Sequence, residues 1–160
     1  MLINPLIGWL VLTALDTWDY GFSIKAGFTF EKYQYLDKSL DFWFRIFMLV
    51  SAWFLMWPDL WIFVVLFMIR FVGELLFLLT KKEITLLFFP NIIHYFYPLY
   101  AIYFVLLKDK YDNNVVLLII FLLAALPKLF LEYRLHYKKD IDPISTGFLK
   151  ESNLTDRKIT

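Results

Sequence analysis

The sequence contains no cysteine, and only five of its 160 residues are glycine. The absence of cysteine excludes disulfide bonds, thiolate metal sites and cysteine nucleophiles. No glycine-rich loop for a phosphate or a dinucleotide is present, and neither is a hydrolase, zinc-protease or calcium motif. The net charge is only +1, which gives no electrostatic basis for binding nucleic acid. The sequence therefore predicts no cofactor, no metal ion and no nucleic-acid partner.

Apolar and aromatic residues are what the sequence has in excess. Hydrophobic residues make up 61% of the chain and aromatic residues 21%. A soluble fold of this size could not bury so much apolar surface. Aromatic side chains are also typical of the boundary between lipid and water. A chain of this length forms one domain, so we expect a single domain embedded in a membrane.

Long apolar stretches, separated by short polar breaks, predict the architecture. About 20 apolar residues are needed to cross a bilayer as a helix. The first stretch is apolar only as far as Leu15, so it crosses only if its helix continues through the acidic residues that follow. We therefore expect an all-α polytopic membrane helix bundle of five transmembrane helices, or four without the first. The predicted spans are Leu2 to Ile24, Phe42 to Trp57, Leu60 to Leu79, Ile84 to Leu107 and Val115 to Leu131.

The polar segments between these spans predict the orientation. Gly21 to Asp41 is expected to be a loop or a surface helix, and residues 140–160 form a polar tail after a transmembrane domain of residues 1–139. Of the 16 Lys and Arg residues, eleven lie in segments on the side of the tail, against Lys108 and Lys110 on the other. The positive-inside rule places the tail in the cytoplasm, in the cell membrane or an internal membrane.

The central span, Leu60 to Leu79, carries two charged residues, Arg70 and Glu74. Their spacing of four residues places both side chains on one face of a helix. An arginine near the bilayer centre costs about 2.5–3.5 kcal/mol on insertion scales, so it usually faces the protein interior and has a partner. We expect this pair to lie at the centre of a polar site.

Other polar residues are expected at the same depth. In an antiparallel helix hairpin, positions equally far from the turn lie at about the same level, and this rule applies to the three short turns of the chain. Asp16 and Asp19, at the end of the first helix, are additional acidic candidates. The predicted polar layer consists of Arg45, Arg70, Glu74, Asn91, His94, Lys128 and Glu132.

The same residues also fit ordinary structural roles. Arg70 and Glu74 can neutralise each other within one helix, and charged side chains near a helix end can extend to the membrane interface. His94 can be a hydrogen-bonded interior residue instead of a ligand. The metal-binding reading of Asp16 and Asp19 is weak, because acidic pairs at such spacing are common.

Three functions remain open. The layer contains three basic and two acidic residues. This slight positive balance suits an anionic or zwitterionic group such as a lipid headgroup. The first hypothesis is therefore the binding or transport of a small anionic or amphiphilic ligand in a pocket open to the cytoplasm. The second is a structural or assembly subunit that contacts other membrane proteins or further copies of itself. The third is a small enzyme acting on lipid or isoprenoid substrates, with Glu74 or an acidic pair as base or metal ligand.

Overall fold

The computed structural model describes residues 4–80, 82, 84–107 and 114–138, without the side chains of residues 16, 17, 19–21, 24, 30, 31, 34, 135 and 136. This part of the chain contains helices and no strand, which confirms the all-α prediction. The predicted tail, residues 140–160, lies outside the described residues. The elements are α1 (Pro5–Lys25), α2 (Phe30–Phe54), α3 (Leu60–Thr80), α4 (Ile84–Phe88), α5 (Ile93–Leu106), α6 (Asn114–Tyr133) and a π-helical turn, η1 (Arg134–Lys138).

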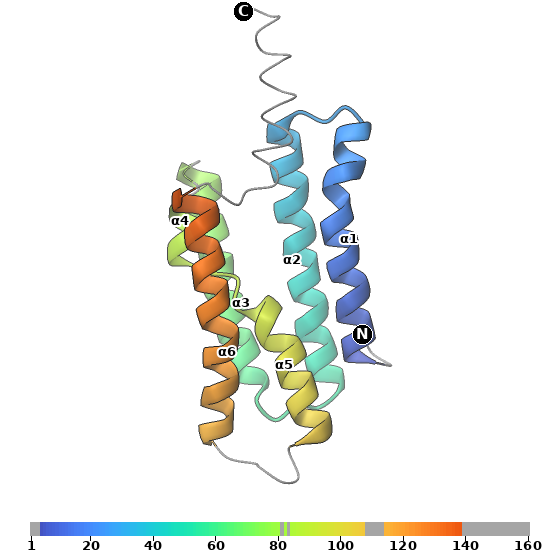
Figure 1. Ribbon diagram of the computed structural model, residues 1–160, viewed down its shortest axis with the longest axis vertical. Helices are drawn as coiled ribbons and strands as arrows, with labels where there is room; N and C mark the ends of the chain where they lie inside the picture. Colours follow the sequence, from blue (N-terminus) through green and yellow to red (C-terminus); the bar gives the residue numbers. More distant parts are fainter. Residues whose placement is uncertain (1–3, 81, 83, 108–113, 139–160) are drawn as a thin grey trace, which may run out of the picture.

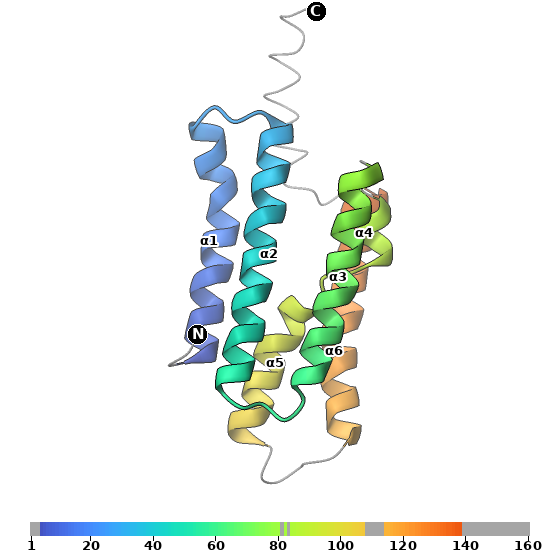
Figure 2. The ribbon, with the colours of Figure 1, turned by 180° about the vertical axis from the view of Figure 1, so that it is seen from behind.

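The helices run up and down along one long axis, as Figure 1 and Figure 2 show. Helices α1, α2 and α3 each make one pass, α4 and α5 together make the fourth, and α6 makes the fifth. Helix α5 lies at the centre of the packing, because it contacts α1, α2, α3 and α6. The chain is therefore an antiparallel bundle whose fourth pass is discontinuous.

An aromatic cluster forms the core in the half of the bundle that holds the connection between α2 and α3. The Trp57 ring lies 4.9 Å from that of Tyr100, and the Phe63 ring lies 5.2 Å from that of Phe96, centroid to centroid. Such pairs contribute about 0.5–1.5 kcal/mol each beyond the area they bury. The hydroxyl of Tyr100 donates a hydrogen bond to Asp59 over 2.7 Å. This half is thus held by ring packing, and the hydroxyls of Tyr97 and Tyr100 are hydrogen-bonded to Ser51 and Asp59.

The segment from Gly21 to Asp41 is mostly helical, which decides between the two predicted alternatives for it. Helix α1 continues to Lys25, and α2 begins at Phe30, so only residues 26–29 connect them. The hydroxyl of Thr29 accepts a hydrogen bond from the backbone N–H of Lys32 over 3.4 Å and caps α2. The predicted span that begins at Phe42 is thus the second half of a longer helix, which starts at Phe30 and ends at Phe54.

The predicted span from Ile84 to Leu107 is divided in two. Helix α4 ends at Phe88 and α5 begins at Ile93. Pro90 explains the break, because proline has no N–H to donate and disfavours a helical conformation in the residue before it. Pro98, in contrast, lies inside α5 without ending it.

Two helices are long and apolar enough to cross a membrane, Leu60–Thr80 and Asn114–Tyr133. A shorter apolar stretch covers Pro5–Leu15. Helix α2 carries several charged residues in its first half, and the break at Pro90 leaves α4 and α5 too short by themselves. By length and composition, two of the five predicted spans therefore qualify among the described residues.

Gly73 offers a test of how closely α3 approaches the break. A Cβ atom added at this position would lie 2.3 Å from the Cβ of Phe89. Alanine has the higher helix propensity by about 1 kcal/mol, but overpacking of this kind costs about 1–3 kcal/mol. We expect Gly73→Ala to lower the midpoint of thermal unfolding in detergent micelles, with Val72→Ala on the exposed side of α3 as the control. An increase in the midpoint, as propensity alone would give, contradicts the close contact.

Candidate functional site

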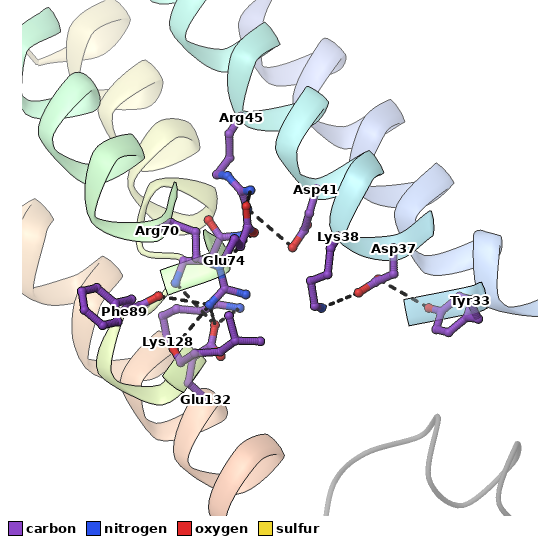
Figure 3. Close-up of polar contacts among 12 residues, drawn as sticks. Tyr33, Asp37, Lys38, Asp41, Arg45, Arg70, Glu74, Phe89, Lys128 and Glu132 are labelled. Atoms are coloured by element: carbon purple, nitrogen blue, oxygen red, sulfur yellow. Dashed lines mark hydrogen bonds and ion pairs between the residues drawn. The ribbon is translucent and has the colours of Figure 1, made fainter. Parts of the chain in front are cut away.

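A network of charged side chains lies where the break in the fourth pass meets α2, α3 and α6 (Figure 3). Arg45 and Glu132 are each 1% exposed, Arg70 is 3% exposed and Glu74 is 7% exposed. Charged side chains are almost never buried to this extent unless they are paired. The arrangement of their charges therefore decides what the site can do.

Glu74 lies between two arginines. The guanidinium of Arg45 donates a hydrogen bond from Nη2 to Oε2 of Glu74, and this ion pair joins α2 to α3. The Nε atom of Arg70 lies 3.3 Å from Oε1 of the same carboxylate. Arg45 also faces Asp41 within its own helix, with 3.6 Å between Nη1 and Oδ2.

The network continues from Arg70 to α6. The Nη1 atom of Arg70 lies 3.6 Å from Oε1 of Glu132, and Nζ of Lys128 lies 3.2 Å from the same oxygen. The chain of ion pairs thus runs from Asp41 on α2 through α3 to Lys128 on α6. It contains three acidic and three basic residues, so its formal charge is zero. The predicted layer by itself has a slight positive charge. Asp41, which the predicted layer omitted, cancels that charge in the network.

The network also satisfies the backbone at the helix break. Arg70 donates from Nη1 to the carbonyl oxygen of Phe89 over 3.1 Å and to that of Leu86 over 3.4 Å. The backbone N–H of Asn91 donates to Oε1 of Glu132 over 3.4 Å. A broken helix leaves carbonyl and N–H groups without helical partners, which is costly away from water. Charged side chains replace part of the hydrogen bonding that Pro90 removes.

Most of the predicted polar layer meets in this network. Five of its seven members join through their side chains, and Asn91 joins through its backbone. The side-chain Oδ1 of Asn91 is buried and has no hydrogen-bond partner among the described residues. The side chains of the additional candidates Asp16 and Asp19 lie outside the described residues. The five layer residues that join the network through their side chains are Arg45, Arg70, Glu74, Lys128 and Glu132.

His94 lies in an aromatic environment next to the network. Its ring packs edge-on to Phe44 at 5.0 Å and to Trp9 at 5.9 Å between centroids. The indole N–H of Trp9 donates to the backbone carbonyl of His94 over 3.0 Å. The predicted depth of His94 did not determine which way its side chain points, because depth leaves rotation about the helix axis open. Its packing is that of an interior residue that joins α5 to α1 and α2.

The sequence-based layer missed Asp41 and two backbone carbonyls. Asp41 precedes Arg45 by four residues, so the spacing that places both on one face was a signal for it. The carbonyl groups of Leu86 and Phe89 gave no side-chain signal. Only the position of Pro90 indicated that carbonyls near it would need other donors.

A second ion pair lies nearer the start of α2. The Nζ atom of Lys38 lies 2.5 Å from Oδ2 of Asp37, and the hydroxyl of Tyr33 donates to Oδ1 of Asp37 over 3.5 Å (Figure 3). Burial lowers the pKa of the Lys38 ammonium, but the carboxylates of Asp37 and Asp41 outweigh it, so the pKa lies above its ordinary value. Lys38 is therefore a positive charge at neutral pH.

A pocket of about 260 Å³ opens between α2 and α3, beside both groups of charges. Glu74 belongs to the network and also to the wall of this pocket. The pocket is therefore a place where a molecule from outside the bundle can approach the buried charges. Its lining residues are Tyr35, Lys38, Ser39, Phe42, Phe71, Glu74, Leu75, Phe77 and Leu78.

Comparison of the chain with protein-family models, with curated proteins and with solved structures gives no match.

A double-mutant cycle tests the coupling between Arg70 and Glu74. Removing one partner of a buried ion pair typically costs about 3–5 kcal/mol, so Arg70→Met and Glu74→Gln should each lower the free energy of unfolding by about that amount. The double variant leaves Arg45 facing Asp41 and Lys128 facing Glu132, so it should be more stable than the sum of the single changes implies. Unfolding of the purified protein in mixed micelles measures all three.

Recovery in the double variant should be incomplete, because the carbonyls of Leu86 and Phe89 lose their donor, at about 1–3 kcal/mol. Lys25→Gln, at the exposed end of α1, serves as the control for the loss of a charge. Additive effects of the two single changes would show that the side chains are not coupled.

Proposed function

We propose that this protein is a multi-pass integral membrane protein that binds or transports a small anionic or amphiphilic ligand in a polar pocket open toward the cytoplasm. The observation that carries the proposal is the distribution of polarity. Four charged side chains are buried in the interior beside the aromatic core, whereas many large apolar side chains are exposed on the outside of the bundle. Water would favour the reverse arrangement, and a lipid bilayer favours this one.

The outer surfaces of α3 and α6 show this most clearly. Trp61 is 65% exposed on α3, and Leu126 is 62% exposed on α6. Monomeric proteins in water rarely expose apolar patches larger than a few hundred Å². Further exposed apolar residues on the two helices are Val64, Val65, Met68, Val72, Leu75, Val115, Leu118, Ile119, Leu122, Leu123 and Phe130.

The five antiparallel passes support the proposed orientation. The α1–α2 connection and the end of α6 lie at one end of the bundle, and the α2–α3 connection lies at the other (Figure 1). Lys25, Lys32, Lys82 and Lys138 all belong to the first end. The positive-inside rule makes that end cytoplasmic. Because α2 begins and α3 ends there, the pocket between these helices lies toward the cytoplasmic side.

The pocket, and not the whole charged layer, supports ligand binding. Within the network the charges balance and bind one another or the broken backbone, and of its six charged residues Glu74 alone belongs to the lining of the pocket. The pocket combines two charged residues, Lys38 and Glu74, with aromatic and aliphatic walls. A concave, mostly apolar site with a few placed polar groups is typical of small-molecule binding.

An assembly subunit is the second candidate. The neutral network at the break stabilises the fold without any ligand, and the exposed apolar faces of α3 and α6 could contact helices of another membrane protein. On this reading, the charges fix the positions of the helices and the outer surface carries the function.

Single cysteines test the orientation, because the natural chain has none. We expect a cysteine in place of Ser152 to react with a membrane-impermeant maleimide only after the membrane is opened. A cysteine in place of Asn114, at the exposed start of α6, should react in intact cells. Reaction of both positions from the same side would exclude an odd number of crossings between them and contradict the proposed topology.

Native mass spectrometry after extraction in a mild detergent tests the ligand. We expect one small amphiphile to be retained per chain. Ser39→Trp should remove it by filling the pocket, whereas Ser39→Ala should not. Retention of another protein in fixed stoichiometry, without a small molecule, would favour the assembly subunit instead.

A further inference from the structure

The wall of the pocket carries one charge of each sign. Lys38 contributes an ammonium group from α2, and Glu74 contributes a carboxylate from α3. Lys38 is held by Asp37, and Glu74 by Arg45 and Arg70, so each charge has a partner outside the pocket. A ligand that carries both signs can place its anionic group by Lys38 and its cationic group by Glu74, whereas a ligand of one sign meets a like charge at one of the two.

Four of the nine residues that line the pocket are aromatic. Tyr35 and Phe42 belong to α2, and Phe71 and Phe77 belong to α3. The rings of Phe42 and Phe71 lie 5.9 Å apart, centroid to centroid. Aromatic faces attract cations, and quaternary ammonium groups are recognised by cages of such rings. Glu74 supplies the acidic side chain of the same lining.

The other groups on the wall suit an anion and an alkyl chain. The ammonium of Lys38 and the exposed hydroxyl of Ser39 are both donors suited to a phosphate. Leu75 and Leu78, each 43% exposed, extend the pocket along the outer surface of α3. At about 260 Å³ the pocket lies just below the range of about 300–1,000 Å³ for small-molecule sites, so it suits a headgroup better than a whole lipid.

We propose that the pocket between α2 and α3 holds the headgroup of a zwitterionic amphiphile that carries a phosphate and a quaternary or primary ammonium group. The phosphate lies by Lys38 and Ser39, the ammonium lies among the rings of Phe42 and Phe71 near Glu74, and the alkyl chain follows Leu75 and Leu78 outward. This assignment rests on the proposed function, since it names the ligand of the same pocket.

Binding to the purified full chain in a sugar-headed detergent tests the assignment. The probes are a lysophospholipid with a phosphocholine headgroup, lysophosphatidic acid with the same chain, and free phosphocholine. We expect the first to bind with a dissociation constant about five- to tenfold lower than the second, which is the value of a cation among aromatic rings. Free phosphocholine should bind more weakly than either, because it lacks the chain.

Two variants separate the parts of the site. Phe42→Leu should remove most of the preference for phosphocholine over lysophosphatidic acid, whereas Phe47→Leu, on the exposed side of the same helix, should leave it unchanged. Lys38→Met should weaken both phosphate-bearing amphiphiles to a similar degree. If Phe42→Leu lowers the unfolding midpoint, the Lys38→Met variant and the comparison of headgroups on the unaltered chain still test the assignment.

The outcomes distinguish this assignment from the broader proposal. Equal binding of the two amphiphiles, or tighter binding of lysophosphatidic acid, would overturn the ammonium site and leave an anion-binding pocket. If free phosphocholine binds as tightly as the lysophospholipid, the alkyl chain contributes nothing, and the proposal that the ligand is an amphiphile is overturned. Binding of none of the three probes, with no amphiphile retained on extraction, would overturn the proposed function as well.

Discussion

The rest of the structure depends on the carboxylate of Glu74 between Arg45 and Arg70. The bond from Arg45 joins α2 to α3, and Arg70 extends the same network to α6 and to the carbonyls at the break in the fourth pass. Three separate helices and one interruption therefore share a single set of charges. Charges buried this deeply are tolerated only while all of them have partners, so the helices around them are fixed relative to one another.

The helix break and the network stabilise each other. Pro90 opens the fourth pass and leaves polar backbone groups in the interior, and Arg70 and Glu132 satisfy several of them. In return, these backbone groups give the buried charges hydrogen-bond partners that an unbroken helix could not offer. Gly73 keeps this region compact, because any larger residue would meet Phe89. The other half of the bundle differs in kind, since rings around Trp57 and Tyr100 pack there instead of charges.

The balance of charge also shapes the functional argument. A cationic layer would have favoured an anion at its centre, but Asp41 makes the network neutral and most of its groups bind one another. A ligand can reach the pocket between α2 and α3, whose lining includes Lys38 from α2, Glu74 from α3 and four aromatic side chains. Specificity in the proposed function therefore comes from the pocket, and the network supplies its rigid support.

The sequence by itself determined the helical class, the positions of most helices and most members of the polar network. The length of an apolar stretch and the spacing of Arg70 and Glu74 are local properties of the sequence. Where a turn is short, residues equally far from it on the two helices lie at about the same depth. The partners of these charges were decided only by the tertiary structure. Rotation about each helix axis directed His94 toward Phe44 and Trp9, and it turned the face of α2 that carries Asp41 and Arg45 toward Glu74. The break at Pro90 put the carbonyls of Leu86 and Phe89 within reach of Arg70, because backbone groups carry no sequence signal until the chain has folded around them.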